Sequence, residues 1–297
     1  MPTKYAGKET VAGKTVVVTG ANTGIGKETC RDLAMRGGRI IMACRNTEKG
    51  EQARKEIVEE TRNEHVVVKE LDLGSLESVQ NFAMNFNESE SRLDILINNA
   101  GVAACPKTLT KDGLEMQIGT NHFGHFLLTN LLLDKLKACS PSRIVIVSSS
   151  AHSMGKMNFN DLNSEKSYGE VAAYGQSKLA NLLHALELSK RLQGTGVTVN
   201  SLHPGAVNTE LTRHAKQKGW ANMLLTAAKP LFVTPEQGAQ TTLRLALDKS
   251  LEQESGKYFA ELKEKTPSNR AQNEADAKRL WDMTEEIMQE KLGSTNM

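Results

Sequence analysis

The segment Tyr174-Gly-Gln-Ser-Lys178 places a phenol and an amine four residues apart. In a helix, residues i and i+4 lie on the same face, so these side chains are neighbours. A free tyrosine titrates at about pH 10, and a nearby ammonium group lowers that pKa. The pair therefore predicts a proton donor that works near neutral pH in general acid catalysis. The alternative is an ordinary pair on a surface helix.

Three consecutive serines, Ser148, Ser149 and Ser150, end the apolar run at 143–148. Ligands of α/β folds bind at the carboxyl edge of the sheet. A serine hydroxyl at that edge is placed to hydrogen-bond a substrate carbonyl. Taken alone, the serines fit turn chemistry equally well.

The segment TGANTGIGKE at 19–28 connects an apolar run to a helical pattern. Its glycines permit a tight turn and let backbone N–H groups approach a pyrophosphate at the helix N-terminus. The spacing is Gly-x3-Gly-x-Gly, so the usual Gly-x-Gly-x2-Gly fingerprint is not matched. We expect a phosphate-binding loop here, with an ordinary strand–helix turn as the alternative. The expected cofactor contacts in it are Gly20, Asn22, Thr23, Gly24, Ile25 and Gly26.

Arg45 follows the second apolar run, and no acidic residue stands between Gly38 and Asn46. A cofactor with a free ribose 2′-hydroxyl usually meets a carboxylate at this point. A guanidinium suits a 2′-phosphate, because it is planar, charged and bidentate. We therefore expect NADP(H) rather than NAD(H), unless Arg45 is only a solvated loop charge. Asp72 and Leu73 are candidates to bracket the adenine.

The chain alternates short apolar runs with helical patterns. The runs are almost continuously apolar, which is typical of strands buried on both faces of a parallel sheet. This succession predicts an α/β fold: one doubly wound, Rossmann-type parallel sheet flanked by helices, in a single domain over 1–297. The expected strands are 15–19, 39–44, 65–71, 94–98, 143–148, 197–202 and 256–259. The expected helices are 27–37, 47–61, 76–86, 113–138 and 171–193.

Two later segments depart from this alternation. Residues 209–233 predict a small helical substrate lid, either packed on the core or forming an apolar entrance that also touches a membrane. Residues 271–292 mix charges with apolar residues at helical spacing, which predicts an amphipathic docking helix. The charge run at 261–265 is expected to be a solvated face.

The composition excludes several classes of protein and of binding site. Lys and Arg number 37 against 35 Asp and Glu, so bulk charge gives no case for binding nucleic acid. The four cysteines form no CxxC pair, and the histidines lack metal-site spacing, so we expect neither disulfides nor metal. No apolar run reaches about 18–20 residues, and the N-terminus is unlike a signal peptide. We expect a cytoplasmic protein, at most peripheral on an intracellular membrane.

The motifs occur in one order: TGxxxGIG at 19–26, NNAG at 98–101, Asn121, Ser149, the Tyr174–Lys178 pair and Pro204-Gly205. This set resembles the short-chain dehydrogenase/reductase family. The stretches NHFGHFLLTNLLLDKLK, YGQSKLANLL, LHPGAV and TPEQGAQTT are similar to its retinol dehydrogenase branch. Members of that branch often carry an N-terminal hydrophobic anchor, whereas the first dozen residues here are polar.

The resemblance implies catalytic roles. Tyr174 would be the acid/base that protonates the carbonyl oxygen, and Lys178 would lower its pKa and hold the nicotinamide ribose. Ser149 would polarise the carbonyl, with the adjacent Ser150 as the alternative. Asn121 would bind a water in a proton relay to Lys178. Further cofactor contacts implied by the resemblance are Asn99, Ala100, Gly101, Pro204, Gly205, Val207 and Thr209.

The expected function is an NADP(H)-dependent oxidoreductase that interconverts an apolar aldehyde or ketone and its alcohol, first of all retinal and retinol. A steroid, a lipid aldehyde or a xenobiotic carbonyl is the alternative substrate. A dinucleotide sensor without turnover is disfavoured, because it could dispense with the four catalytic residues. The resemblance also implies a homodimer through the helices at 113–138 and 171–193.

Overall fold

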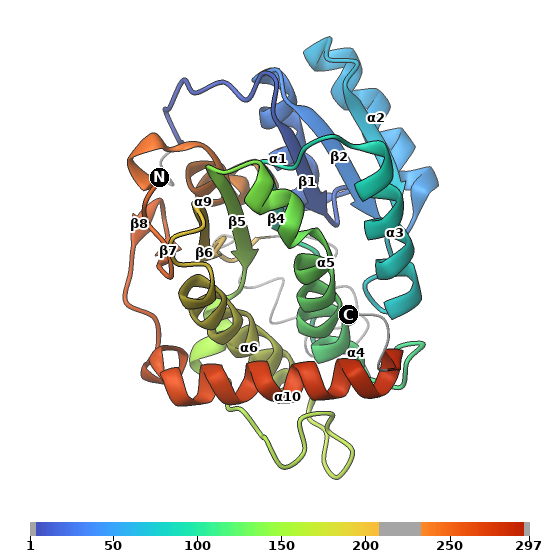
Figure 1. Cartoon of the computed structure of the whole chain (residues 1–297), viewed down its shortest axis with the longest axis vertical. Helices are drawn as coiled ribbons and strands as arrows, with labels where there is room; N and C mark the ends of the chain where they lie inside the picture. Colours follow the sequence, from blue (N-terminus) through green and yellow to red (C-terminus); the bar gives the residue numbers. More distant parts are fainter. Residues whose placement is uncertain (1–3, 208–232, 294–297) are drawn as a thin grey trace.

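The structure, a computed structural model, describes residues 4–207 and 233–293. Within them, eight strands form one sheet in the order β3-β2-β1-β4-β5-β6-β7-β8 (Figure 1). All neighbours are parallel except β8, which is antiparallel to β7. The strands are β1 (Thr15–Thr19), β2 (Arg39–Cys44), β3 (Val66–Glu70), β4 (Ile95–Asn98), β5 (Ser142–Val147), β6 (Val197–His203), β7 (Tyr258–Ala260) and β8 (Lys263–Glu264). The predicted Rossmann-type sheet is confirmed.

Helices cover both faces of this sheet. They are α1 (Gly24–Met35), α2 (Thr47–Thr61), α3 (Leu76–Ser89), α4 (Met116–Ile118), α5 (Gly124–Ala138), α6 (Glu170–Arg191), α9 (Pro235–Leu247) and α10 (Glu274–Leu292). One core joins the sheet to α1, α2 and α9, and the other joins it to α3, α5, α6 and α10.

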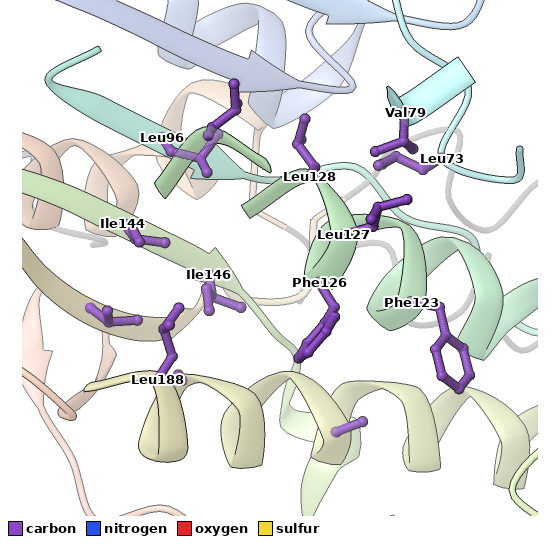
Figure 2. Packing of buried hydrophobic residues seen from close by; sticks show 14 of the residues in the cluster. Leu73, Val79, Leu96, Phe123, Phe126, Leu127, Leu128, Ile144, Ile146 and Leu188 are labelled. Carbon is purple, nitrogen blue, oxygen red and sulfur yellow. The ribbon is translucent and has the colours of Figure 1, made fainter. Parts of the chain in front are cut away.

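Successive strand residues enter opposite cores. In β1, Val16 and Val18 pack in the core of α1, and Val17 packs in the core of α5. This alternation explains why the strand is apolar at every position, since both of its faces are buried. In Figure 2, Ile146 of β5 and Leu188 of α6 belong to the second of these cores.

The order of the strands reverses between β1 and β4. After β1 the chain moves to β2 on one side, and after β4 it moves to β5 on the other. Such a switch point opens a crevice at the carboxyl ends of the strands, where α/β folds bind ligands. The glycine loop follows β1 and the NNAG motif lies at the end of β4, so both reach this crevice.

The helix predicted over 113–138 is interrupted. It begins at Met116, where the Glu115 carboxylate accepts the N–H groups of Gln117 and Ile118. A π-helical turn follows over Gly119–Phe123, before α5. Turns of this kind arise where side chains compete with the regular ladder and are frequent at functional sites.

Three smaller differences concern one helix start, one further helix and one further strand. Helix α1 begins at Gly24, three residues before its predicted start. Helix α9 was not predicted, although Thr234 and Gln237 form a capping box with proline at the first helical position. The charge run at 261–265 is solvated as expected, but it also contains the short strand β8.

The amphipathic C-terminal helix is present as α10, which lies across α5 and α6 (Figure 1). Its Trp281 ring packs on Phe126 of α5 at 4.8 Å and on His184 of α6 at 5.7 Å, between ring centroids. These are the helices for which a subunit interface was expected, and α10 covers part of their surface.

The predicted lid falls almost wholly on residues 208–232, outside the described residues. Among the described residues that flank 208–232, Val207 pairs with Val233 and the Val233 N–H donates to the Ala206 carbonyl. In the part of the chain that the structure describes, no helix has the length and apolar character to cross a membrane.

Candidate active site

A cleft of about 560 Å³ opens at the carboxyl ends of the central strands. It gathers nearly all of the site residues that the sequence predicted. Those that line it are Gly20, Asn22, Thr23, Gly24, Ile25, Gly26, Arg45, Asp72, Leu73, Asn99, Ala100, Gly101, Ser149, Tyr174, Lys178, Pro204, Gly205 and Val207. Asn121 does not line the cleft, and Thr209 lies outside the described residues.

The glycine loop needs its glycines. Gly20 and Gly24 have φ of +65° and +57°, a region that side chains other than glycine rarely adopt. A Cβ on Gly26 would stand 2.4 Å from the Gly20 carbonyl oxygen, so the backbone turns too tightly for any other residue.

The N-terminus of α1 opens into the cleft. Its N-cap, Thr23, makes no side-chain cap, and the first turn contains no acidic residue. The first N–H groups of a helix lack partners in the helix and favour an anion. This backbone therefore fits the pyrophosphate of a dinucleotide.

Thr19, at the end of β1, holds the NNAG loop beside the glycine loop. Its hydroxyl oxygen accepts the N–H groups of Asn99 and Ala100, both at 2.9 Å. The Asn99 amide donates in turn to the Thr19 carbonyl at 2.7 Å. A Cβ on Gly101 would lie 3.0 Å from the Asn121 amide oxygen and 3.4 Å from the Lys178 nitrogen, so this loop packs closely on the predicted catalytic residues.

Arg45 lies directly after β2 and is exposed at the rim of the cleft. Lys49, four residues later in α2, also lines the cleft and was missed in the sequence analysis. The signal in the sequence is a second cation in the first turn of the helix that follows Arg45. Asp72 lines the same part of the cleft and accepts the Gly74 N–H.

Tyr174 and Lys178 share one face of α6, as predicted. The Lys178 nitrogen lies 6.0 Å from the Tyr174 ring centroid and donates to the Val147 carbonyl at 3.2 Å. Burial lowers the pKa of Lys178 to about 8. Burial also raises the pKa of Tyr174, so the net shift is upward and not the lowering that was predicted. Desolvation favours the neutral phenol and outweighs other influences, which leaves Tyr174 protonated.

The three serines point to different partners. The buried Ser148 hydroxyl donates to the Lys178 carbonyl at 2.7 Å. The Ser149 hydroxyl accepts the Ala151 N–H at 3.2 Å and also interacts with Tyr174, which opposes the rise in the Tyr174 pKa. Ser150 is exposed, and its N–H donates to His203. Of the three, Ser149 is therefore the serine that acts on the candidate acid.

Asn121 lies in the π-helical turn and is fully buried. Its amide oxygen accepts the Val102 N–H at 2.8 Å, and its amide nitrogen donates to the Val102 carbonyl and the Ser177 hydroxyl, both at 2.9 Å. The His125 ring hydrogen-bonds to its carbonyl oxygen at 3.1 Å. The Asn121 side chain thus ties the loop after β4 to α6 rather than facing the cleft. These partners were missed, because nothing in the sequence marks them.

Comparisons with known proteins agree on one family. A model described as short chain dehydrogenase matches residues 14–220. Human retinol dehydrogenase 13 is 55% identical over 92% of this chain and 84% of its own length. Human retinol dehydrogenase 11 is 51% identical over 93% of this chain and 86% of its own length.

Solved structures agree with these relatives. An uncharacterized protein from Mycobacterium paratuberculosis is 39% identical, with a TM-score of 0.79 and 97% of each chain covered. A putative NAD(P)-dependent gluconate 5-dehydrogenase from Beutenbergia cavernae, with bound NADP, is 27% identical, with a TM-score of 0.70 over 86% of this chain and 97% of that one.

Proposed function

The chain belongs to the short-chain dehydrogenase/reductase family and is an oxidoreductase similar to its retinol dehydrogenases, and from this we propose a specific activity. It reduces an apolar aldehyde or ketone to the alcohol with NADPH, and its first-choice substrate is retinal. The observation that carries the proposal is the meeting of Ser149, the protonated Tyr174 and the buried Lys178 in one cleft that begins at a phosphate-binding loop.

In the proposed reaction, Tyr174 is the acid. A bound reduced nicotinamide supplies the hydride that the carbonyl carbon accepts. The Tyr174 hydroxyl gives its proton to the carbonyl oxygen, and the Ser149 hydroxyl donates a hydrogen bond to the same oxygen. The Lys178 ammonium lies beside the phenolate that remains and stabilises its charge. Asn121 holds the NNAG loop against α6, so that the cofactor side of the cleft keeps its shape.

The preference for NADP(H) rests on charge. Arg45 and Lys49 place two cations at the end of the cleft that β2 borders, where the adenosine ribose of a dinucleotide binds in this fold. No carboxylate lies between Gly38 and Asn46 to accept a ribose 2′-hydroxyl. A 2′-phosphate gains charge-assisted hydrogen bonds there. Asp72 and Leu73 border the adenine in this arrangement.

The apolar substrate is proposed from the names of the relatives and from exposed apolar side chains on segments next to Ser149 and Tyr174 in the sequence. Met154 and Val171 are large apolar side chains with exposed fractions of 68% and 60%, on the segments that follow Ser149 and precede Tyr174. We further propose a cytoplasmic protein in peripheral contact with membranes, from which it takes its substrate. We propose that a homodimer, if formed through α5 and α6, uses the part of their surface that α10 leaves uncovered.

Steady-state kinetics with all-trans-retinal test this function. We expect turnover with NADPH and a much lower kcat/KM with NADH. Turnover of steroid or lipid carbonyls but not retinal would keep the reaction and replace the substrate. Binding of NADPH without turnover of any carbonyl would contradict the proposal and favour the dinucleotide sensor.

A further inference from the structure

The peptide group between Ser149 and Ser150 is held from both sides by histidine rings. The Ser149 carbonyl accepts a hydrogen bond from His152 Nδ1 at 2.6 Å. The Ser150 N–H donates to His203 Nδ1 at 3.1 Å. The two rings come from different elements, since His152 lies in the 3-10 turn after β5 and His203 is the last residue of β6.

We propose that His152 and His203 are positioning residues that fix the direction of the Ser149 hydroxyl by clamping this peptide group. The proposal rests on the proposed function, in which Ser149 contacts the substrate carbonyl. Ser149 has an extended backbone, with φ −155° and ψ 157°. The orientation of its peptide group sets ψ at Ser149 and φ at Ser150. A peptide group bonded at both ends cannot rotate, so the side chain of Ser149 keeps its place beside Tyr174.

The clamp requires one proton arrangement. His152 Nε2 accepts the Ser268 N–H at 3.3 Å, so the proton of this ring is on Nδ1. His203 Nδ1 accepts the Ser150 N–H, so the proton of that ring is on Nε2. The two histidines are therefore neutral and in opposite tautomers.

The surroundings keep both rings neutral. Burial lowers the pKa of His152, and burial together with the nearby His152 lowers the pKa of His203. Glu261 faces His203 and acts in the opposite direction, and Tyr258 of β7 packs edge-on against His152 at 5.2 Å between centroids. A second proton on His203 would sit on Nδ1, face the Ser150 N–H and break the clamp. A second proton on His152 would sit on Nε2 and break only its bond with the Ser268 N–H.

The C-terminal part of the chain supports this arrangement. Ser268 and Tyr258 both contact His152, and the Arg270 guanidinium donates to the Gly155 carbonyl at 3.0 Å. Residues more than a hundred positions from Ser149 thus fix the turn that carries it. This gives the segment after β7 a part in positioning the site.

Tautomers test the clamp without any assay of activity. In protein with 15N-labelled histidine, long-range 1H–15N spectra distinguish Nδ1–H from Nε2–H rings. The variants His152→Phe and His203→Phe assign the two signals, because each removes one. We expect the Nδ1–H form for His152 and the Nε2–H form for His203. The reverse tautomer at either ring would overturn the proposal.

Steady-state kinetics test whether the clamp matters for turnover. His152 does not line the cleft, so His152→Phe, which keeps a ring against Tyr258, should leave the dissociation constant of NADPH unchanged. It should lower kcat by up to about a hundredfold through misplacement of Ser149. The exposed Lys156, in the same loop, provides the control Lys156→Ala, which should leave kcat unchanged. Wild-type kcat in His152→Phe would overturn the proposal.

Rescue separates positioning from mere packing. An asparagine oxygen occupies nearly the same place as a histidine Nδ1 and also accepts an N–H. His203→Asn should therefore recover most of the activity that His203→Leu loses, and should lose the acid limb of the pH profile that His203 titration produces. Equal loss in both variants would refute the acceptor role. If the wild type reduces no carbonyl, the proposed function fails, while the tautomers still decide whether the clamp exists.

Discussion

The buried His184 makes the stability of the fold depend on pH. It lies in α6 between Phe126 of α5 and Trp281 of α10, and its Nε2 has no hydrogen-bond partner among residues 4–207 and 233–293. Burial lowers its pKa from 6.5 to about 4. The unfolded chain therefore binds a proton in a pH range where the folded protein does not. The contribution of the neutral ring is complete above the unfolded pKa and is lost as the pH falls towards the folded value.

The size of the effect follows from the two pKa values. Between about pH 7.5 and about pH 5, a histidine with pKa values of about 6.5 unfolded and about 4 folded loses about 2 kcal/mol of unfolding free energy. The variant His184→Phe keeps an aromatic ring beside Trp281 but removes the titrating group. Its loss between the two pH values should be smaller than that of the wild type by about 2 kcal/mol.

Urea denaturation, followed by the fluorescence of the tryptophans, measures these free energies at the two pH values. Phe126→Leu is the control, since it removes packing from the same cluster and no titrating group. It should lower the free energy of unfolding equally at both pH values. If His184→Phe has the same pH dependence as the wild type, the burial argument is refuted.

Three further changes give separate tests. Arg45→Asp should move the ratio of kcat/KM for NADPH over NADH towards NADH, and an unchanged ratio would remove Arg45 from the 2′-phosphate site. Gly26→Ala should weaken NADPH binding in a fluorescence titration, because its Cβ would stand 2.4 Å from the Gly20 oxygen, and wild-type affinity would contradict this packing. Trp281→Ala should cost about 3–5 kcal/mol in urea denaturation, and a loss below about 1 kcal/mol would show that α10 adds little to the core.

The sequence predicts the strands and most helices closely, because both faces of the sheet are buried. That burial makes strands such as β2 visible as unbroken apolar runs, and the predicted bounds of β2 and α2 agree with the structure. The interruption before α5 was missed, since it depends on the Glu115 cap and on the contact of Asn121 with Val102. Such contacts join segments that are distant in the sequence, and no local sequence pattern indicates that these segments meet in the fold.

In the candidate site, too, some features can be predicted from the sequence and others cannot. Motifs identify the residues that line the cleft, because each of these positions needs either a particular backbone conformation or a particular side-chain chemistry. Neither the direction of the Tyr174 pKa nor the bonded place of the Asn121 amide follows from spacing, since each depends on burial by distant segments. The partners of His152 and His203 lie on three separate parts of the chain, so only the folded arrangement brings them together.

The central claim is that Tyr174 donates the proton in an NADPH-dependent carbonyl reduction. The most direct measurement compares Tyr174→Phe with the wild type in kcat for the carbonyl that the wild type reduces, all-trans-retinal first, and in the dissociation constant of NADPH. The account predicts a kcat lower by about 10²- to 10⁴-fold, the usual contribution of general acid catalysis, with NADPH binding nearly unchanged. A variant that binds NADPH and keeps substantial turnover would contradict it.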